Sequence, residues 1–460
     1  MAQAYDSELL KEHWGEVLDF DGDGLSKIAD PHKRLVTATV MENTIRDLGV
    51  ANRIEGIKKS VLNEAVPTNS TGNDIDNFDP VMISMLRRSM PNLIAYDIMG
   101  VQAMTGPTGL IFAFRGRYSN QTNSATEMFY NEADTGFGRE NFAAASTLGN
   151  RHVGTVPGNT SQTTLLATSN AYNYVTGMPT ATGEGLGSNS TLIFPEVAFS
   201  IEKVNVLATE KALKAEYSVE MAQDLKAVHG LDAETELSTL ITGELLAEIN
   251  RQMVRTINVT AMRGCSEGTT NPGVFDLDTD SNGRWLVEKF KGLMFQLERE
   301  ANKIAKATRR GRGNIILCSS DVASALQMAG VLDYTPALSS NGLSIDDTGI
   351  TFAGILNGKY RVYIDPYVMG GDYLTMGYKG PNPMDAGIFY CPYVPLQQFR
   401  AVNPDTFQPK IAYKTRYGVV ANPFCKVTES AGVFTPAAGL GALEADGNAY
   451  YRRVIVTNIM

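Results

Sequence analysis

The longest regular pattern of hydrophobic positions lies in the middle of the chain, over residues 232–261. Apolar side chains recur there every four residues, at Leu237, Ile241, Leu245, Ile249, Met253 and Ile257. This spacing places them on one slowly drifting helix face. A helix of about 30 residues spans roughly 45 Å, so we expect a spine across a domain. A second amphipathic helix is predicted for 285–307, and Ser218 and Gly230 are typical of the two ends of a short helix.

Alternating or continuous apolar runs predict strands on both sides of these helices. The expected strands are 93–99, 110–118, 197–206, 314–318, 360–364, 373–376, 388–390 and 410–414. Further helices are expected after Asp79-Pro80, which suits a helix start, and from Asp321. This mixture of separate helical and strand-forming segments predicts the α+β fold class.

Two segments lack these long patterns. Residues 1–64 are polar, with twelve acidic and eight basic side chains, and their apolar residues come in short helical groups. The Gly- and Pro-containing stretch 66–74 then predicts an exposed connection. Residues 119–192 are rich in Ser, Thr, Asn and Gly. Because a structureless loop of that length is unusual inside a domain, we expect an inserted module on an extended hairpin.

Length and charge narrow the class of protein. A chain of 460 residues is long enough for several packed units, and a net charge of -10 argues against a protein that grips nucleic acid over a broad surface. We expect no membrane span, because no run approaches about 20 apolar residues, and the N-terminus does not read as a signal peptide. The four cysteines are widely spaced, which is typical of reduced, buried thiols.

The sharpest chemical motif is an acidic loop near the N-terminus. Asp19, Asp21 and Asp23 occupy positions 1, 3 and 5 of a twelve-residue calcium loop, Gly24 position 6 and Asp30 position 12. An EF-hand prefers Glu at position 12 and usually has a partner hand, which the sequence lacks. The sequence therefore leaves two interpretations, a weak calcium-binding loop and an acidic turn between two short helices. The pattern favours the acidic turn.

The sequence predicts no enzyme, no catalytic residues and no cofactor. It has four histidines, no H-x-x-x-H pair and no G-x-S-x-G elbow. Residues 354–360 imitate a phosphate-binding loop, but the spacing is one residue short and the Ser or Thr is missing, so we predict a turn before a strand. The basic cluster of Arg309, Arg310 and Arg312 suits a solvated helix end, with a subunit or phosphate contact as the alternative.

Several longer strings occur in the order of one protein family. They are Arg87–Asp97 with Gly100–Gln102, Ala222–Gly230, Gly358–Asp365, Gly377–Asn382 with Met384–Gly387, and Lys414–Gly418 with Asn422–Phe424. In these strings the chain resembles the major capsid protein of T-even-type tailed bacteriophages. The resemblance extends from about residue 78 to Tyr450–Arg453 and weakens in 1–60 and 119–192.

The resemblance implies the tailed-phage major capsid fold, with an N-terminal arm, an extended hairpin loop, a peripheral domain and an axial domain. The implied division is 1–64 (removable N-terminal assembly segment), 65–108 (N-terminal arm and first peripheral elements), 109–208 (extended hairpin loop with an inserted module at about 119–192), 209–274 (peripheral domain with the spine helix), 275–395 (axial domain) and 396–460 (return to the peripheral domain and C-terminus).

The resemblance also implies a structural role in a virion assembled in the host cytoplasm. Family members form hexamers in an icosahedral or prolate head shell that encloses double-stranded DNA without specific binding. The implied partners are further copies of the chain, a vertex protein, scaffold or core proteins, a portal, a maturation protease and decoration proteins. A vertex (pentamer) paralogue and a bacterial encapsulation-type shell protein share the fold and remain alternatives.

The family is also processed after a Leu/Ile-x-Glu pattern, and Leu62 and Glu64 stand directly before Ala65. Residues 10–12 match the pattern too. A protease needs an extended, exposed chain, and the stretch from residue 66 onward supplies one. We therefore predict maturation cleavage between Glu64 and Ala65.

Overall fold

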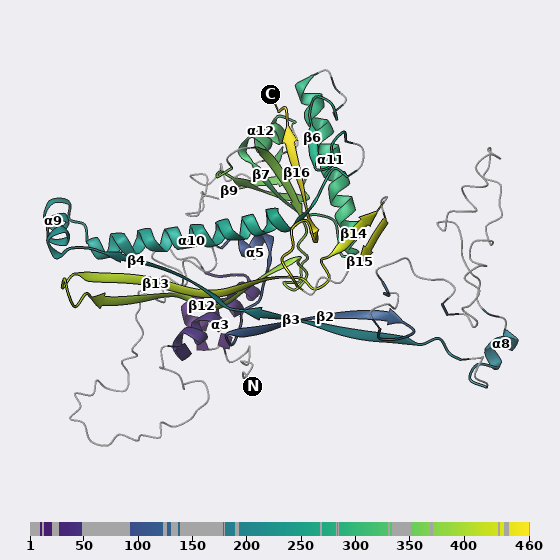
Figure 1. Cartoon of the computed structure of the whole chain (residues 1–460), viewed down its shortest axis with the longest axis horizontal. Helices are drawn as coiled ribbons and strands as arrows, with labels where there is room; N and C mark the ends of the chain where they lie inside the picture. The colour runs from purple at the N-terminus through teal and green to yellow at the C-terminus, as the bar shows by residue number, and fades with distance from the viewer. Residues whose placement is uncertain are drawn as a thin grey trace. The chain divides into compact units, whose positions relative to one another are not determined.

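The computed structural model describes the chain as two compact units (Figure 1). One contains the described residues of Met1–Ile111 and Lys203–Met460, and the other those of Phe112–Glu202. The described residues are 10–11, 13–20, 27–47, 93–122, 127–129, 137–138, 178, 180–188, 193–266, 269–281, 283, 285–329, 332–333, 351–368, 371–430, 433–436 and 441–459. Helices and strands are both abundant, so the predicted α+β class is confirmed.

The predicted spine is present as helix α10 (Ala233–Thr260). Its first half buries Ile241 and Leu245 against a sheet, together with Tyr413 of that sheet. Its second half buries Met253 and Ile257 in the main core. The helix thus uses one apolar face along its whole length to hold two parts of the unit together.

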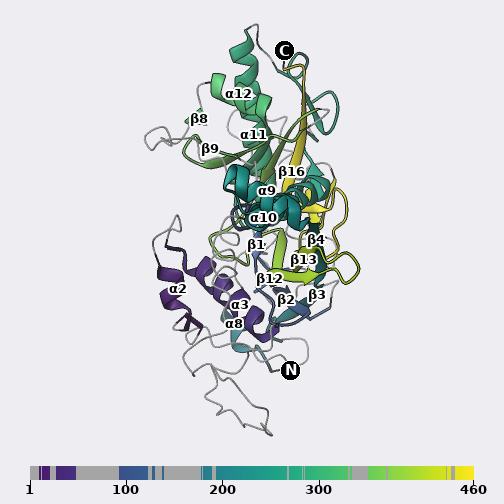
Figure 2. The same cartoon turned by 90° about the vertical axis from the view of Figure 1, so that its left-hand side faces the viewer.

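The sheet beside the first half of α10 contains four described strands, in the order β1-β12-β13-β4. They are β1 (Gly100–Val101), β4 (Thr209–Glu216), β12 (Ile388–Val402) and β13 (Pro409–Ala421). β12, β13 and β4 are antiparallel neighbours, whereas β1 pairs with β12 in parallel. Figures 1 and 2 show α10 and helix α3 (Pro31–Asp47) on opposite sides of β12 and β13.

The larger sheet contains eight described strands in the order β5-β16-β11-β7-β10-β9-β8, with β6 also pairing with β16. They are β5 (Ala261–Arg263), β6 (Val274–Asp276), β7 (Ile315–Ser319), β8 (Leu332–Asp333), β9 (Thr351–Leu356), β10 (Tyr360–Asp365), β11 (Asp372–Gly377) and β16 (Asn448–Thr457). The C-terminal strand β16 therefore lies inside the sheet, between β11 on one side and β5 and β6 on the other. The expected segment 396–460 contributes to both sheets, because β13 belongs to the smaller sheet and β16 to the larger one.

Two helices pack on the larger sheet. Helix α11 (Leu286–Thr308), predicted for 285–307, packs against β16 and β11, and helix α12 (Ser320–Met328) packs against β7, β10 and β11. The strand β7 is buried at every position, as expected for a strand covered on both faces. A short hairpin, β14 (Val427–Ser430) and β15 (Val433–Pro436), completes this region.

The N-terminal helices share the core of the same unit. Helices α2 (Gly15–Asp19) and α3 bury apolar residues in one cluster with Leu93 and Val101. The predicted strand 93–99 is wrong, because residues Ala95–Ile98 form the short helix α5. A continuous apolar run fits a helical turn buried on all sides as well as it fits a strand. The helix expected after Asp79 lies outside the described residues.

The second unit contains most of a two-stranded hairpin, β2 (Thr108–Tyr118) and β3 (Val197–Leu207), whose residues up to Ile111 and from Lys203 belong to the first unit. Both strands were predicted, and the pairing continues to a hydrogen bond of 3.0 Å from the Ser119 amide to the Glu196 carbonyl. Between them the described elements include the short helix α8 (Thr180–Glu184). Most of the predicted inserted module at 119–192 lies outside the described residues, and its fold remains a prediction.

Candidate functional site

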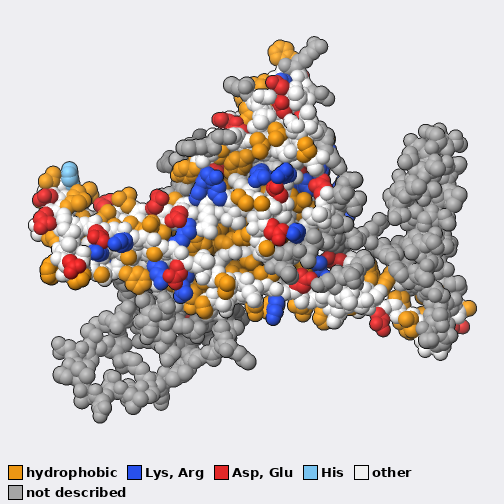
Figure 3. Space-filling view, in the orientation of Figure 1, with side chains coloured by type: hydrophobic (Ala, Val, Ile, Leu, Met, Phe, Trp, Pro, Cys, Tyr) orange, Lys and Arg blue, Asp and Glu red, His pale blue; other side chains and the backbone are white. Residues whose placement is uncertain are grey.

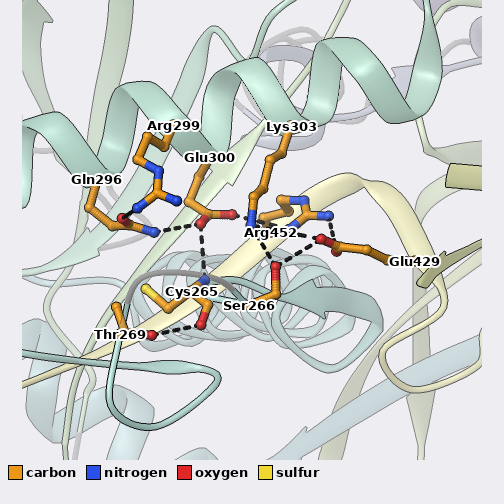
Figure 4. Close-up of polar contacts among 9 residues, drawn as sticks. All are labelled: Cys265, Ser266, Thr269, Gln296, Arg299, Glu300, Lys303, Glu429 and Arg452. Atoms are coloured by element: carbon orange, nitrogen blue, oxygen red, sulfur yellow. Dashed lines mark hydrogen bonds and ion pairs between the residues drawn. The ribbon is translucent and has the colours of Figure 1, made fainter. Parts of the chain in front are cut away.

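A buried cluster of charged side chains joins α11, β14 and β16 (Figure 4). Arg452 of β16 lies 3.2 Å from a carboxylate oxygen of Glu300 on α11 and 2.6 Å from one of Glu429 on β14. Lys303 lies 3.7 Å from the other oxygen of Glu429, and Ser266 donates a hydrogen bond to that oxygen. Two cations and two anions therefore neutralise one another across three elements that are distant in sequence.

The second oxygen of Glu300 accepts bonds from the Cys265 amide at 2.9 Å and from Gln296 at 2.7 Å. Burial alone would raise the pKa of Glu429, but the hydrogen bond and charge of Arg452 bring it below its ordinary value. Burial and the Glu300 charge raise the pKa of the Cys265 thiol to about 12. A thiol held protonated is a poor nucleophile, so this cluster suits holding elements together rather than covalent chemistry.

The candidate calcium residues have other partners where the structure describes them. Asp19 forms ion pairs with Lys27 at 3.1 Å and with Arg34 at 2.7 Å, and these bonds lower its pKa. Asp30 accepts a hydrogen bond of 2.9 Å from the His32 amide at the start of α3. Asp21 and Asp23 lie outside the described residues, so the calcium loop stays a prediction.

The structure also describes the predicted turn at 354–360 and the basic cluster after α11. Asn357 and Gly358 have φ values of 52° and 65° in the tight turn between β9 and β10, which confirms the predicted turn in place of a phosphate loop. Arg309 ends α11, and Arg312 pairs with Glu298. The cleavage residues Leu62, Glu64 and Ala65 lie outside the described residues.

One face of the β2–β3 hairpin is apolar and exposed. Its side chains are Phe112, Phe114, Val197, Phe199 and Ile201, which are 53–65% exposed. They alternate along their strands, and the rings of Phe114 and Phe199 stack with centroids 5.4 Å apart. We call these five residues the hairpin face; hydrophobic side chains are visible along the two strands in Figure 3. An exposed aromatic and aliphatic patch of this kind is typical of a protein–protein contact.

The charged side chains at the alternate positions of the hairpin are paired. Arg117 donates to Ser200 at 3.0 Å and lies 3.8 Å from Glu202, while Arg115 lies 3.4 Å from Glu127. Residues 127–128 pair along the outer edge of β2. The charged side chains of this face are therefore paired within the unit, whereas the apolar face is the one left to solvent.

A second exposed apolar region surrounds helix α9 (Val219–His229) and the turn between β12 and β13. Its large side chains, 45–76% exposed, are Val219, Met221, Val228, Leu231, Phe399, Val402 and Phe407. We call this region the tip surface; Figure 3 shows hydrophobic side chains among acidic ones over α9. The predicted caps are present, since Ser218 accepts a bond from the Met221 amide and Gly230 adopts φ of 68°.

The alternation of apolar and polar residues revealed the hairpin strands but not that their apolar face would be exposed. Strand patterns normally point apolar residues into a core. One signal of this exposure was available in the sequence, since only two strands flank a long polar segment. Two strands alone cannot bury an apolar face. Among the described helices, none combines the length and apolar character needed to cross a membrane.

Comparison with known proteins points to one family. The profile of the family described as "Major capsid protein Gp23" matches residues 75–456. The chain is similar to the major capsid protein of Salmonella phage ViI, with 38% identity over 461 residues that cover 98% of each chain. It is also similar to the major capsid protein of Enterobacteria phage T4, with 36% identity over 520 residues that cover 98% of this chain and 99% of the relative.

Two weaker similarities accompany these. The capsid vertex protein of Enterobacteria phage T4 is 26% identical over 246 residues, covering 50% of this chain and 54% of the relative. A solved structure titled "Mycobacterium phage Bobi" superposes with a TM-score of 0.39 and 8% identity, covering 80% of this chain and 91% of that chain.

Proposed function

Because this chain belongs to the Gp23 major capsid protein family, we propose that its copies form hexamers that assemble into a phage head shell around double-stranded DNA. As a family member it is a structural shell protein and a virion component, not an enzyme. We further propose that the shell assembles in the host cytoplasm with a vertex protein, scaffold or core proteins and a portal. The net charge of -10 supports enclosure of DNA without specific binding, because like charges repel.

The observation that carries the assembly proposal is the exposed hairpin face. Each of its five apolar side chains is more than half exposed. Transfer of these side chains out of water would be favourable, because burial of apolar surface lowers the free energy. A contact with another subunit would bury them, and their stacked aromatic pair fits the composition of interface centres. The tip surface supports further contacts in the same way.

Replacing both Phe114 and Phe199 with Ser tests this proposal. Both side chains are exposed, so the variant should keep the circular dichroism and unfolding temperature of the unchanged protein while losing assembly. Light scattering and negative-stain microscopy would follow assembly. Phe295→Ser on α11, also an exposed aromatic at 68%, is the matched control and should assemble normally. If the double variant forms particles at the same protein concentrations as the unchanged protein, the role of the hairpin face is contradicted.

We also propose that the chain matures by cleavage between Glu64 and Ala65. This cut would separate residues 1–64 from the remaining 396 residues. Glu64→Gln should give shells that assemble but keep this segment, whereas Glu12→Gln should be processed as usual. The intact mass of the shell protein in mature particles is the measurement. A mass that includes residues 1–64 would refute the cleavage.

The vertex paralogue is the second candidate, because similarity to a capsid vertex protein covers half of this chain. The similarity to major capsid proteins is higher in identity and covers nearly the whole chain, which favours the shell role. Quantitative mass spectrometry of virions separates the two roles. A major capsid protein would be the most abundant shell component, and a vertex protein would be present in a small fixed number.

A further inference from the structure

The N-terminal helices cover one side of the main core. Six apolar residues of this segment are almost completely buried in the cluster that also contains Leu93, Ile98 and Val101; they are Leu10, Trp14, Leu18, Val36, Val40 and Met41. Loss of this segment would return apolar surface of the core to water. The surface under α3 therefore needs a cover in any state that lacks the segment.

Two side chains of α3 bind main-chain carbonyls at the edge of the smaller sheet. His32 Nε2 lies 2.9 Å from the Val101 carbonyl, and Asn43 donates to the carbonyls of Met104 at 2.7 Å and Tyr393 at 2.9 Å. The amides of Gln102 and Met104 bind β12 instead. Since β1 is an edge strand, these bonds cap polar groups that another chain could use.

Polar groups in or next to this contact are also incompletely satisfied. Among the described residues, the Tyr96 hydroxyl, a Gln102 side-chain oxygen and a Glu42 carboxylate oxygen are buried without a hydrogen-bond partner. Each such group opposes burial, in contrast to the paired charges around Arg452. The helix α3 is thus held by apolar packing and a few capping bonds, with unpaired polar groups that favour its release.

The covered surface contains a basic side chain that an acidic partner could contact. Lys379 lies in it and donates to the Tyr96 carbonyl, and burial lowers the pKa of Lys379 to about 8. Residues 1–64 carry a net charge of -4 and the whole chain -10, so the remainder carries -6. A second copy of the processed chain is therefore itself acidic and would meet a basic group on this surface.

We propose that Tyr96, Val101, Gln102, Lys379 and the main-chain carbonyl of Met104 form a masked contact surface for a second copy of this chain, covered by α3 until the N-terminal segment leaves. This inference rests on the proposed cleavage. It makes α3 a cover that prevents one class of subunit contact before processing. A second copy is the occupant because it supplies both the negative charge and exposed apolar strands.

The test uses the full chain with a site for a specific protease placed in residues 66–74, so that the folded protein is cut in place. Size-exclusion chromatography follows release of the N-terminal fragment, and sedimentation velocity follows association of the rest. Release should convert the cut chain to larger species. Excess peptide of residues 10–47 should bind the vacated surface and suppress that conversion.

Two variants in α3 sharpen the test. Asn43→Ala removes both bonds to main-chain carbonyls and should raise the ratio of released to retained fragment roughly tenfold. Thr44→Ala is the matched control, because the Thr44 hydroxyl bonds to the Val40 carbonyl of its own helix. It should release the fragment like the unchanged chain.

Three results would overturn the inference: a fragment retained in every variant, release without a change in association, or association that the peptide does not suppress. Particles that form regardless of the peptide would contradict this inference and leave the proposed shell function intact. Absence of any assembly, with or without the fragment, would contradict the shell function itself.

Discussion

Arg452 illustrates how single residues decide the packing of this protein. Its side chain is completely buried and satisfies two carboxylates that come from other elements. The partners lie 152 and 23 residues away in sequence. No local pattern places a cation beside a carboxylate at such separations, so the sequence could not reveal this cluster. The strand β16 that carries Arg452 was not predicted either.

Replacing Arg452 with Met should lower the free energy of unfolding by about 3–5 kcal/mol, because it leaves Glu300 as a buried, unpaired charge. Adding Glu300→Leu should recover part of that loss, since neither charge then remains. Lys426→Ala, which removes an exposed pair with Glu444, should cost less than about 1 kcal/mol. Urea denaturation measures all three, and equal losses for Arg452→Met and Lys426→Ala would contradict this account.

His32 makes the docking of α3 dependent on pH. Burial lowers the pKa of His32, and Lys379 lowers it further, while the Val101 carbonyl and Asp30 raise it. Because the docked state disfavours the proton, docking should be strongest above the ordinary value of about 6.5 and should weaken as pH falls through it.

Hydrogen exchange of residues 31–47 at several pH values measures this effect, after correction for the intrinsic pH dependence of exchange. His32→Gln keeps a donor to the carbonyl and removes the titration, so its α3 protection should not fall between pH 7 and 5.5. The same loss of protection in both proteins would show that another group is responsible.

At the scale of elements, helix α9 is unusual because none of its eleven residues is buried. Helices this short are marginal in water unless tertiary contacts stabilise them. The caps at Ser218 and Gly230 are therefore a large part of what holds it in a single subunit.

We expect α9 to exchange its amide hydrogens quickly in unassembled protein and slowly in assembled particles, where the tip surface would be covered. Ser218→Ala should destabilise the helix by about 1 kcal/mol and accelerate exchange before assembly. Hydrogen exchange with mass spectrometry measures both effects, and α11, which buries ten residues, serves as the internal reference. Protection of α9 equal to that of α11 before assembly would contradict this expectation.

The two long predicted helices were located well because long periodic patterns are local signals. The expected 232–261 and 285–307 became Ala233–Thr260 and Leu286–Thr308. Strand β4 was missed, since its alternation of small and charged residues lacks large apolar side chains. The family resemblance, and with it the structural role, was confirmed by the comparisons.

At the scale of the whole molecule, the division into two units predicts that the hairpin insertion is dispensable for folding. The first unit contains both large sheets and the main core. The hydrogen bond between Ser119 and Glu196 shows that the two strands remain adjacent at their far ends, so a short linker can join them.

Deleting residues 121–191 with a short linker should therefore leave the helical circular dichroism signal of α10 and α11 in place. Particles formed by the shortened chain should be less resistant to heat, because contacts made by the insertion are lost. Calorimetry of the particles measures the second effect. Collapse of the helical signal would mean that the insertion belongs to the folding core.

The central position of β16 has a consequence for synthesis of the protein. The strand joins β11 to β5 and β6, and it follows every other described strand of this sheet in the sequence. The larger sheet therefore cannot close on a nascent chain until residues 448–457 have left the ribosome. Chains that stop before β16 therefore lack a complete sheet, and we expect them to fail as partners of full subunits.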